Sequence, residues 1–222
     1  VAEVIDLARE TGCRVHILHV SSAEVLPLLA KARADGVRIT AETCPHYLTF
    51  AAEQIADGAT QFKCCPPIRD AANRKALWAG LADGVIDCVV SDHSPCPPEL
   101  KRGDFATAWG GISSVQLGLS VIWTAARARG HTLSDVAAWM SRRPAALVGL
   151  RRKGSIAVGG DADLVAFDPE RRWTVRAADL HHRHPVTPYD GRELTGAVRA
   201  TWLRGRRTDS TPSGRLLSQE ES

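Results

Sequence analysis

The sequence predicts an α/β protein built on a parallel β-sheet, and three observations lead to this fold class. A short apolar run bounded by turn residues, typical of a buried parallel strand, occurs at 86–90, and two further strands are expected at 13–20 and at 37–43, where apolar and polar residues alternate. A stretch expected to be helical precedes each of these strands, at 1–11, 23–35 and 70–81. Glycines follow two of these helices, at Gly12 and Gly36. Helices and strands in alternation, with short returns, are the pattern of a parallel sheet.

Several of these elements carry their own boundary signals. Ser21 and Ser22 precede the helix at 23–35 and are good N-cap residues, and Asp70 has the same place before the helix that ends at Leu81. The segment 61–69 contains two prolines, which fix their own φ angles and restrict the residue before them. We therefore expect a rigid loop between the second and third strands.

The pattern changes twice after residue 95. A long loop is expected over 95–111, followed by helices at 112–129 and 133–141 and by a closing segment at 142–150. From Gly154 onward short strands with glycine turns are expected, at 154–167, 173–176 and 197–204. The sequence thus predicts one domain over 1–150 and a second over 151–208. Residues 209–222, rich in Ser, Pro and Glu, are expected to form a disordered tail.

Composition excludes several classes of protein. The 222 residues are 44% hydrophobic and 24% charged, with a net charge of +3, which is typical of a globular protein. No basic stripe indicates nucleic-acid binding, and no apolar run approaches the ~20 residues of a membrane helix. Six cysteines without C-x-x-C spacing indicate reduced thiols, and with no signal peptide we expect a cytoplasmic protein.

Asp92 is the candidate acid of a functional site. It directly follows the strand predicted at 86–90, and the carboxyl ends of parallel strands are where α/β proteins place their chemistry. Strand alternation puts Asp92 on one face with Cys88 and puts Asp87 on the other. A second interpretation stays open, in which Asp92 caps the turn before a proline-rich loop.

Two histidines belong to the strand predicted at 13–20. His16 and His19 would lie on opposite faces of that strand, so they could not bind one ion together. His19 is nearer the carboxyl end and is the better candidate ligand. The alternative is that His19 is a hydrogen-bonded packing residue, the usual role of a lone histidine on a strand.

Four stretches of the sequence carry motifs that occur together in one enzyme family. They are His19-Val20-Ser21-Ser22, Glu42-Thr43-Cys44-Pro45-His46-Tyr47-Leu48, Lys63-Cys64-Cys65-Pro66-Pro67-Ile68-Arg69, and Ser91-Asp92-His93-Ser94-Pro95 with the later Trp109-Gly110-Gly111. In this order they resemble the allantoinases, a group of cyclic amidohydrolases related to hydantoinase, dihydropyrimidinase and dihydroorotase. The resemblance implies the last three or so strands of a (β/α)8 barrel over 1–150 and part of a small β-sandwich over 151–208.

The resemblance also implies a reaction. Enzymes of this group hold two divalent metal ions, usually zinc, bridged by a carboxylated lysine, and open the ring of allantoin to give allantoate in purine breakdown. His19 matches a metal ligand, and Asp92 matches the acid that binds metal and takes the proton from the attacking hydroxide. A metal-bound water has a pKa near neutrality, so a neighbouring carboxylate can accept its proton. A homo-oligomer, expected to be a tetramer, is implied as well.

Further residues match substrate-binding positions of the group. They are His46, Cys65, Pro67, His93, Gly110 and Gly111. His46 stands where hydantoinases tend to carry glutamine, which favours allantoinase. The alternatives are a loop histidine that holds its turn at 46 and small packing residues at Cys64 and Cys65. His181, His182 and His184 lie in a turn that matches a structural motif of the group, so a surface role is expected for them.

The remaining metal ligands of the group are missing from this sequence. A catalytic zinc normally has three protein ligands, and only His19 and Asp92 match here. We therefore expect a C-terminal part of a longer enzyme, starting within a domain and inactive alone, with an open sheet edge. Two other functions stay open, which are ring opening of the hydantoinase or dihydropyrimidinase type and a non-catalytic scaffold.

Overall fold

The computed structural model describes residues 1–208 and Gly214, which form two compact units. The first contains Val1–Gly118 and Val175–Arg192, and the second contains Leu119–Thr174 and the described residues from Glu193 onward. These two units do not coincide with the two domains expected over 1–150 and 151–208. The expected boundary near Leu150 separates a barrel from a β-sandwich, and it stays a prediction. The tail expected at 209–222 lies, apart from Gly214, outside the described residues.

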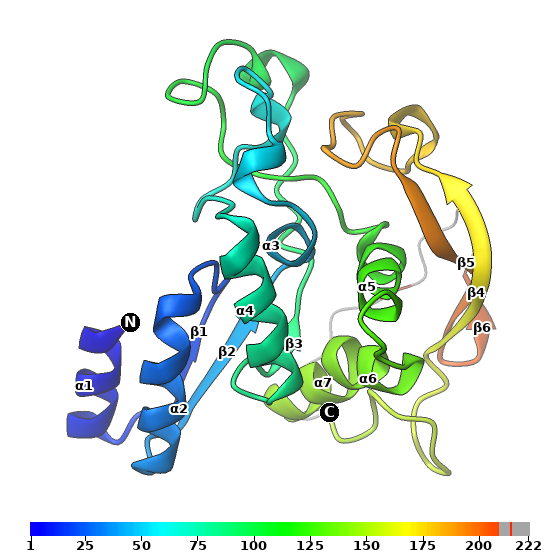
Figure 1. Cartoon of the computed structure of the whole chain (residues 1–222). Coiled ribbons are helices and arrows are strands. Elements are labelled where there is room, and N and C mark those ends of the chain that lie inside the picture. The colour runs from blue at the N-terminus through cyan, green and yellow to red at the C-terminus, as the bar shows by residue number, and fades with distance from the viewer. Residues whose placement is uncertain (209–213, 215–222) are drawn as a thin grey trace. The chain divides into compact units, whose positions relative to one another are not determined.

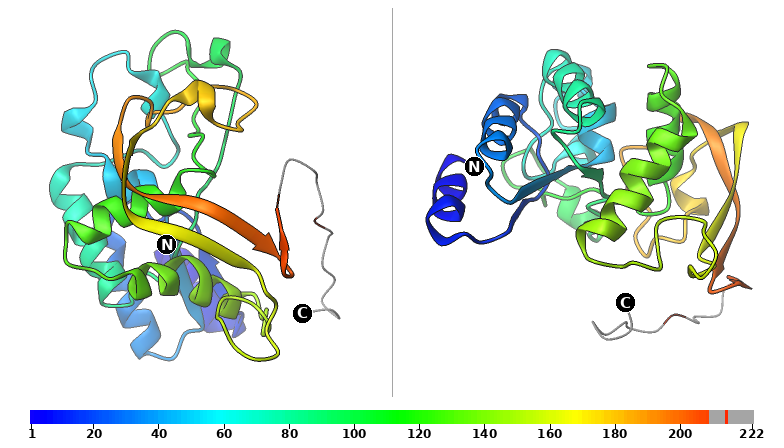
Figure 2. Two further views of the ribbon diagram at one scale, coloured as in Figure 1. Left: turned by 90° about the vertical axis from the view of Figure 1, so that its right-hand side faces the viewer. Right: turned by 90° about the horizontal axis from the view of Figure 1, so that it is seen from below.

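The first unit is a parallel sheet covered by helices, as predicted. Strands β1 (Val15–Ile17), β2 (Ile39–Thr43) and β3 (Cys88–Val89) pair in that order, all parallel. Helices α1 (Ala2–Thr11), α2 (Leu26–Ala34) and α4 (Ala71–Ala82) lie along one face of this sheet (Figures 1 and 2). The shorter helices of this unit are α3 (Pro45–Thr49), η1 (Ala23–Val25), η2 (Ala52–Gln54), η3 (Thr60–Phe62), η4 (Pro98–Lys101) and η6 (Ala177–Asp179).

The predicted boundary signals of these helices are confirmed. Gly12 ends α1 in the left-handed conformation, with φ 66°. The Ser22 hydroxyl accepts a hydrogen bond from the Glu24 N–H, so the helical segment begins at 23. The Asp70 carboxylate accepts from the Asn73 N–H at 2.7 Å and begins α4. The Ser22 and Asp70 caps each satisfy a backbone N–H that the helix itself leaves unpaired.

The strands are shorter than the sequence predicted. The strand expected over 13–20 is reduced to β1, and the strand expected over 86–90 is reduced to β3. The left-handed backbone of His19, with φ 37°, interrupts the strand that was predicted to reach Val20. Asp92, with φ 43°, turns the chain two residues after the end of the strand predicted at 86–90. The expectation that strand alternation directs the side chains of His19 and Asp92 was therefore wrong, since the alternation stops before each of them.

The core of this unit lies between the sheet and its helices. Ile39 and Ala41 of β2 are buried, and so are Leu77 and Leu81, one turn apart on α4. Burial of a Leu or Ile side chain contributes about 1.5–3 kcal/mol. This packing fixes β2 and leaves its alternate residues for the opposite face.

Asp87 belongs to this scaffold. Its carboxylate accepts a hydrogen bond from the Ala41 N–H at 2.7 Å and forms an ion pair with Arg33. The Arg33 guanidinium also donates to the carbonyls of Ile39 and Gly84. Asp87 thus ties α2 to β2, in agreement with the prediction that it is not the acid of the site.

The second unit contains four helical segments and an antiparallel sheet. The helices are α5 (Gly118–Arg127), α6 (Leu133–Ala137), the π-helix η5 (Ala138–Arg142) and α7 (Arg143–Leu147), and the strands are β4 (Leu164–Thr174), β5 (Glu193–Leu203) and β6 (Arg206–Arg207). The strand order is β4–β5–β6. On α5, the Thr124 hydroxyl accepts from the Thr195 N–H at 2.9 Å, and the Trp123 N–H donates to the Pro169 carbonyl. These bonds join α5 to β5 and β4.

Three predictions for this part of the chain need correction. The helix expected from 112 begins only at Gly118, because Ile112 pairs with His93 instead. The helix expected to stop at 141 continues to Leu147, and Pro144 lies in the first turn of α7, where no N–H is needed. The short strands expected over 154–176 form one strand, β4, that starts at Leu164.

The six cysteines all carry free thiols, as the sequence indicated. In the described part of the chain, every helix is too short or too polar to cross a lipid bilayer.

Candidate active site at the carboxyl ends of the strands

His19 and Asp92, the two candidate ligands, follow β1 and β3 in the same unusual backbone conformation. Among the described residues other than glycine, only they and Arg204 have positive φ angles. Such a conformation costs about 1–2 kcal/mol for a residue with a Cβ atom. Residues held in this way concentrate at functional sites. The strain therefore marks the two positions independently of their side-chain chemistry.

A cluster of three donor groups surrounds Asp92. Atoms of Cys44, His46 and Asp92 that could each bind a metal ion lie within 4.8 Å of one another. His46 is in α3, directly after β2, and is fully buried together with Cys44. Neither ring nitrogen of His46 has a hydrogen-bond partner in the part of the chain that the structure describes. A buried imidazole without a partner is costly, and this observation points to a missing ligand.

The electrostatics of the cluster agree with its geometry. Burial, together with a smaller effect of the nearby charge of His19, lowers the pKa of His46 to about 3, so the imidazole is neutral. Burial raises the pKa of the Cys44 thiol far above its usual range, and the Asp92 carboxylate adds to that effect. His19 thus affects the pKa of His46, and Asp92 affects that of Cys44, the residue beside His46 in the cluster. The structure therefore brings His19, His46 and Asp92 together.

His93 connects this cluster to the segment that contains Gly110 and Gly111. His93 forms an isolated parallel bridge with Ile112, and its Nδ1 accepts hydrogen bonds from the N–H groups of Ser114 and Val115. Gly111 is packed so closely that a Cβ atom there would lie 2.7 Å from the Ser94 carbonyl oxygen. Only glycine fits this position beside the Asp92 loop.

Cys65 and Pro67 lie on a loop of their own, which we call the proline loop (63–69). The Tyr47 hydroxyl donates to the Pro66 carbonyl at 2.7 Å and holds this loop against α3. The Cys65 side chain is exposed, and a Cβ atom at Gly110 would lie 2.9 Å from its sulfur. Cys65 therefore contacts the predicted substrate glycines. Cys65 and Pro67 also line a cavity of about 480 Å³, which His19, His46 and Asp92 do not line.

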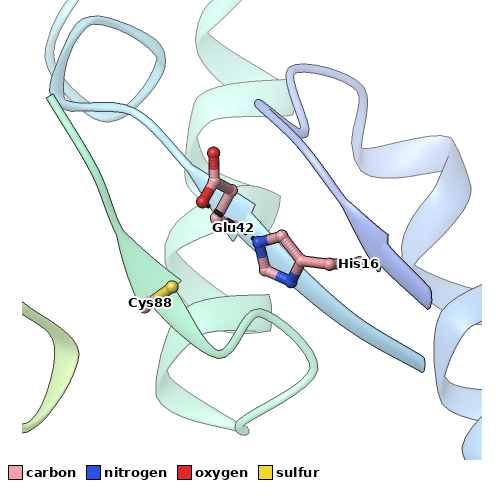
Figure 3. Close-up of side chains that lie close together, drawn as sticks. All are labelled: His16, Glu42 and Cys88. Carbon is pink, nitrogen blue, oxygen red and sulfur yellow. Dashed lines mark hydrogen bonds and ion pairs between the residues drawn. The ribbon is translucent and has the colours of Figure 1, made fainter. Parts of the chain in front are cut away.

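A second group of donor atoms lies further down the strands. His16, Glu42 and Cys88 project from one face of the sheet, from β1, β2 and β3 (Figure 3). The His16 ring already has partners for both nitrogens, with Thr40 Oγ1 at 2.8 Å and Glu42 Oε2 at 3.0 Å. We assign this pair to the scaffold, where it fixes β1 against β2 below the candidate site. His16 therefore belongs to this scaffold pair, and no hydrogen bond or ion pair of the described residues joins it to His19.

The cluster around Asp92 fits a divalent metal ion. Imidazole and carboxylate groups are ligands of zinc and related metals. In the described part of the chain, no hydrogen bond or ion pair occupies the side chains of His19, His46 or Asp92. By contrast, the histidine and the carboxylate in the second group already bind each other. Donors without a partner thus converge around Asp92, so the surroundings of Asp92, and not the second group, are the candidate place for a metal ion.

Sequence reasoning missed Cys44 and Lys101. Cys44 was part of the Glu42–Leu48 motif but was given no role, and only its place beside His46 and Asp92 marks it. The Lys101 Nζ donates to the carbonyls of Lys63, Trp109 and Gly111 at 3.1, 2.8 and 2.7 Å. No local motif in the sequence could have indicated this contact, since it joins segments far apart in the chain.

Known proteins similar to this chain are allantoinases in sequence. The allantoinase of Streptomyces avermitilis is 56% identical over 99% of this chain and 51% of its own length. The allantoinase of Saccharomyces cerevisiae is 50% identical over 86% of this chain and 42% of its own length. The allantoinase of Arabidopsis thaliana is 48% identical, over 87% and 40%. The chain thus spans about half the length of these relatives, or less.

Solved structures similar to this chain are hydantoinases and dihydropyrimidinases. D-hydantoinase from a Bacillus species matches with a TM-score of 0.86 and 31% identity, over 93% of this chain and 47% of its own. Dihydropyrimidinase from Brevibacillus agri matches with a TM-score of 0.87 and 29% identity, over the same shares. The amidohydrolase family profile matches residues 1–208, so nearly the whole described chain is covered. The chain belongs to the amidohydrolase family.

Proposed function

We propose that this chain is part of an allantoinase, which hydrolyses the cyclic amide of allantoin to give allantoate. The observation that carries the proposal is the buried, unpartnered His46 beside Asp92, in a chain 43–56% identical to several allantoinases. Ring opening of a five-membered cyclic amide needs a nucleophilic water, a proton acceptor and polarisation of the carbonyl. The candidate site offers groups for each of these tasks.

The residues of this chain have distinct roles in the proposal. His19 and Asp92 would hold a divalent metal ion, which when bound supplies an activated water and polarises the amide carbonyl. The Asp92 carboxylate accepts the proton from the attacking water and returns it to the amide nitrogen that leaves. His46 and His93 orient the substrate, and the loops with Cys65, Pro67, Gly110 and Gly111 bind its ring.

The structure of the parent enzyme is part of the same proposal. Residues 1–150 would complete a (β/α)8 barrel with strands from outside this chain, and 151–208 would be part of a β-sandwich. The open edges of β1 and β3 support this assignment, since parallel sheets are normally closed or covered. The metals would be two zinc ions bridged by a carboxylated lysine. Free thiols support the cytoplasm as its location.

The alternative is a hydantoinase or dihydropyrimidinase. The fold supports it equally, because solved structures of those enzymes match over 93% of this chain. Their sequence identity is about 30%, well below that of the allantoinases. His46 favours allantoin as the substrate, since hydantoinases tend to carry glutamine in that place.

Substrate comparison tests the proposal directly. The complete product of the gene that encodes this chain is purified, loaded with zinc and assayed with allantoin, a 5-substituted hydantoin and dihydrouracil. We expect allantoin to react with the highest kcat/KM and a chelator to abolish the reaction. Preference for either other substrate would establish the alternative.

A chimera extends the test to this chain itself. The chain replaces the matching half of the Streptomyces avermitilis allantoinase, and the Asp92→Asn chimera is the control. We expect the chimera to open allantoin and the control to be inactive. A folded, zinc-loaded chimera without activity would favour a scaffold function. Light scattering on the active protein tests the expected tetramer.

A further inference from the structure

Lys101 lies at the junction of two loops that the proposed function assigns to the substrate. These are the proline loop (63–69) and the segment Trp109–Ile112, which we call the glycine loop. The Lys101 ammonium donates one hydrogen bond to the proline loop, at the Lys63 carbonyl, and two to the glycine loop, at Trp109 and Gly111. An ammonium group has three N–H donors, so this arrangement uses all of them.

The surroundings of Lys101 make these bonds strong. Its side chain is half-buried, and no carboxylate forms an ion pair with it among the described residues. Burial lowers the pKa of Lys101, while the nearby thiols of Cys96 and Cys64 act in the opposite direction. Hydrogen bonds from a charged donor are roughly twice as strong as neutral ones. The three carbonyls are thus the groups that stabilise the buried charge.

Two further contacts join the same loops. The Gly111 N–H donates to the Lys63 carbonyl at 2.9 Å, so this carbonyl accepts from both Gly111 and Lys101. The Ser94 N–H donates to the Ile112 carbonyl at 2.9 Å, which ties the glycine loop to the segment that begins with Asp92. A continuous path of hydrogen bonds therefore runs from the proline loop through Lys101 to the Asp92 loop.

We propose that Lys101 is a positioning residue, which holds the proline loop and the glycine loop together in the arrangement that binds the substrate ring. Lys101 acts through the backbone of both loops and does not touch the reacting atoms. The identity of the substrate in this inference rests on the proposed function. The clamp, by which we mean the three hydrogen bonds of Lys101 that join the two loops, rests on the contacts themselves. Removing the ammonium leaves three carbonyls without their donor and frees the loops from each other.

The test replaces Lys101 by methionine, which keeps the length of the side chain but not its charge. In the complete gene product, Lys101→Met should raise the KM for allantoin about tenfold and leave kcat within about threefold, because uniform binding is lost. Lys101→Arg retains the charge and should give an intermediate KM. The matched control is Lys31→Met. Lys31 is an exposed residue of α2 that pairs with Asp35. It should leave both constants unchanged.

Hydrogen exchange provides a readout that does not depend on the substrate. In Lys101→Met, the amide of Gly111 should exchange about tenfold faster, with no change over α2 and α4. Unchanged exchange would overturn the clamp, and faster exchange with an unchanged KM would overturn its role in binding. Should the wild-type protein not act on allantoin, the proposed function fails, and the exchange data still decide whether Lys101 holds the loops. Should Lys101→Met not fold, the same measurements on Lys101→Arg decide.

Discussion

A ring nitrogen of His46 and a carboxylate oxygen of Asp92 lie within 4.8 Å of each other, although the two residues follow different strands. His46 comes after β2 and Asp92 after β3, and β2 pairs directly with β3. Parallel pairing brings the carboxyl ends of neighbouring strands to one edge, so the contact follows from the topology. This edge carries both the strained backbone and the unpartnered imidazole.

Asp92→Asn should abolish catalysis without unfolding the protein. The change removes the proton acceptor and a metal ligand, so kcat for allantoin should fall by about a thousandfold or more. Because no hydrogen bond or ion pair of the described residues uses this carboxylate, the thermal midpoint of the metal-free protein should stay within about 2 °C. Steady-state kinetics, zinc content and thermal unfolding are measured on the complete gene product.

Asp87→Asn is the matched control for Asp92→Asn. Asp87 lies five residues earlier, accepts from the Ala41 N–H and pairs with Arg33. Its loss should cost about 1–3 kcal/mol of folding stability and leave kcat within a few-fold. The assignment of the two acids would be wrong if Asp87→Asn lost activity while Asp92→Asn lost only stability.

His46→Leu should stabilise the metal-free protein. The buried imidazole has no hydrogen-bond partner among the described residues, and leucine has a similar volume without a polar group. We expect unfolding in denaturant to require about 1 kcal/mol more, while activity on allantoin is lost. Activity and stability should thus change in opposite directions. A His46→Leu protein that is less stable than the wild type would show that the imidazole has a partner at this position.

Local chemistry in the sequence was sufficient to predict most of the first unit. The end of α1 at Gly12 and the starts of the helices after Ser22 and Asp70 depend on neighbouring residues only, and all three boundaries were confirmed. The order of helices and strands likewise gave the parallel sheet. The length of β1 could not be predicted, because the left-handed turn at His19 breaks the extended backbone within the stretch that was predicted as a strand.

Long-range contacts explain what the sequence did not reveal. Ile112 belongs to a run with helical periodicity, yet it pairs with His93, which lies nineteen residues earlier. The three carbonyls that bind Lys101 come from 63, 109 and 111, and no spacing of residue types indicates such a junction. His19 and Asp92 were found because each lies at the carboxyl end of a predicted strand, and His46 was found because it matches a substrate-binding position of the allantoinases. Their roles as metal and substrate ligands stay predictions.

Gly196→Ala should destabilise the second unit through a steric clash. Gly196 has φ 94°, and a Cβ atom there would lie 2.3 Å from Phe167 Cζ and 2.4 Å from Trp123 Cδ1. The left-handed backbone costs about 1–2 kcal/mol and the overpacking about 1–3 kcal/mol more. Gly159→Ala is the control, because Gly159 has φ 84° with nothing within 4 Å of its Cβ position. Equal losses in denaturant unfolding would refute the clash.

An ion cluster around Lys153 should make the stability of the second unit depend on pH. Lys153 pairs with Asp161 at 3.0 Å and also with Asp163, and Arg152 pairs with Asp161 at 2.9 Å. The hydrogen bond from Lys153 lowers the pKa of Asp161 below 3.8. For Asp163, burial raises the pKa, but the bond from Lys153 helps to lower it overall. The bond to Asp163 raises the pKa of Lys153 above 10.5.

Lys153→Met should therefore lower the thermal midpoint most at neutral pH. A carboxylate with a lowered pKa stabilises the folded state above its unfolded pKa, and this contribution is lost as the pH falls through the folded pKa. At pH 7 we expect a loss of about 2–4 °C by calorimetry, and at pH 3 a smaller loss, because the contribution fades as the pH falls below 3.8 towards the folded pKa values. Lys31→Met removes an exposed pair and should stay within about 1 °C. The same loss at both pH values would show that Lys153 stabilises the unit through its aliphatic packing, because packing of the side-chain methylenes does not depend on the charge of Asp161 or Asp163.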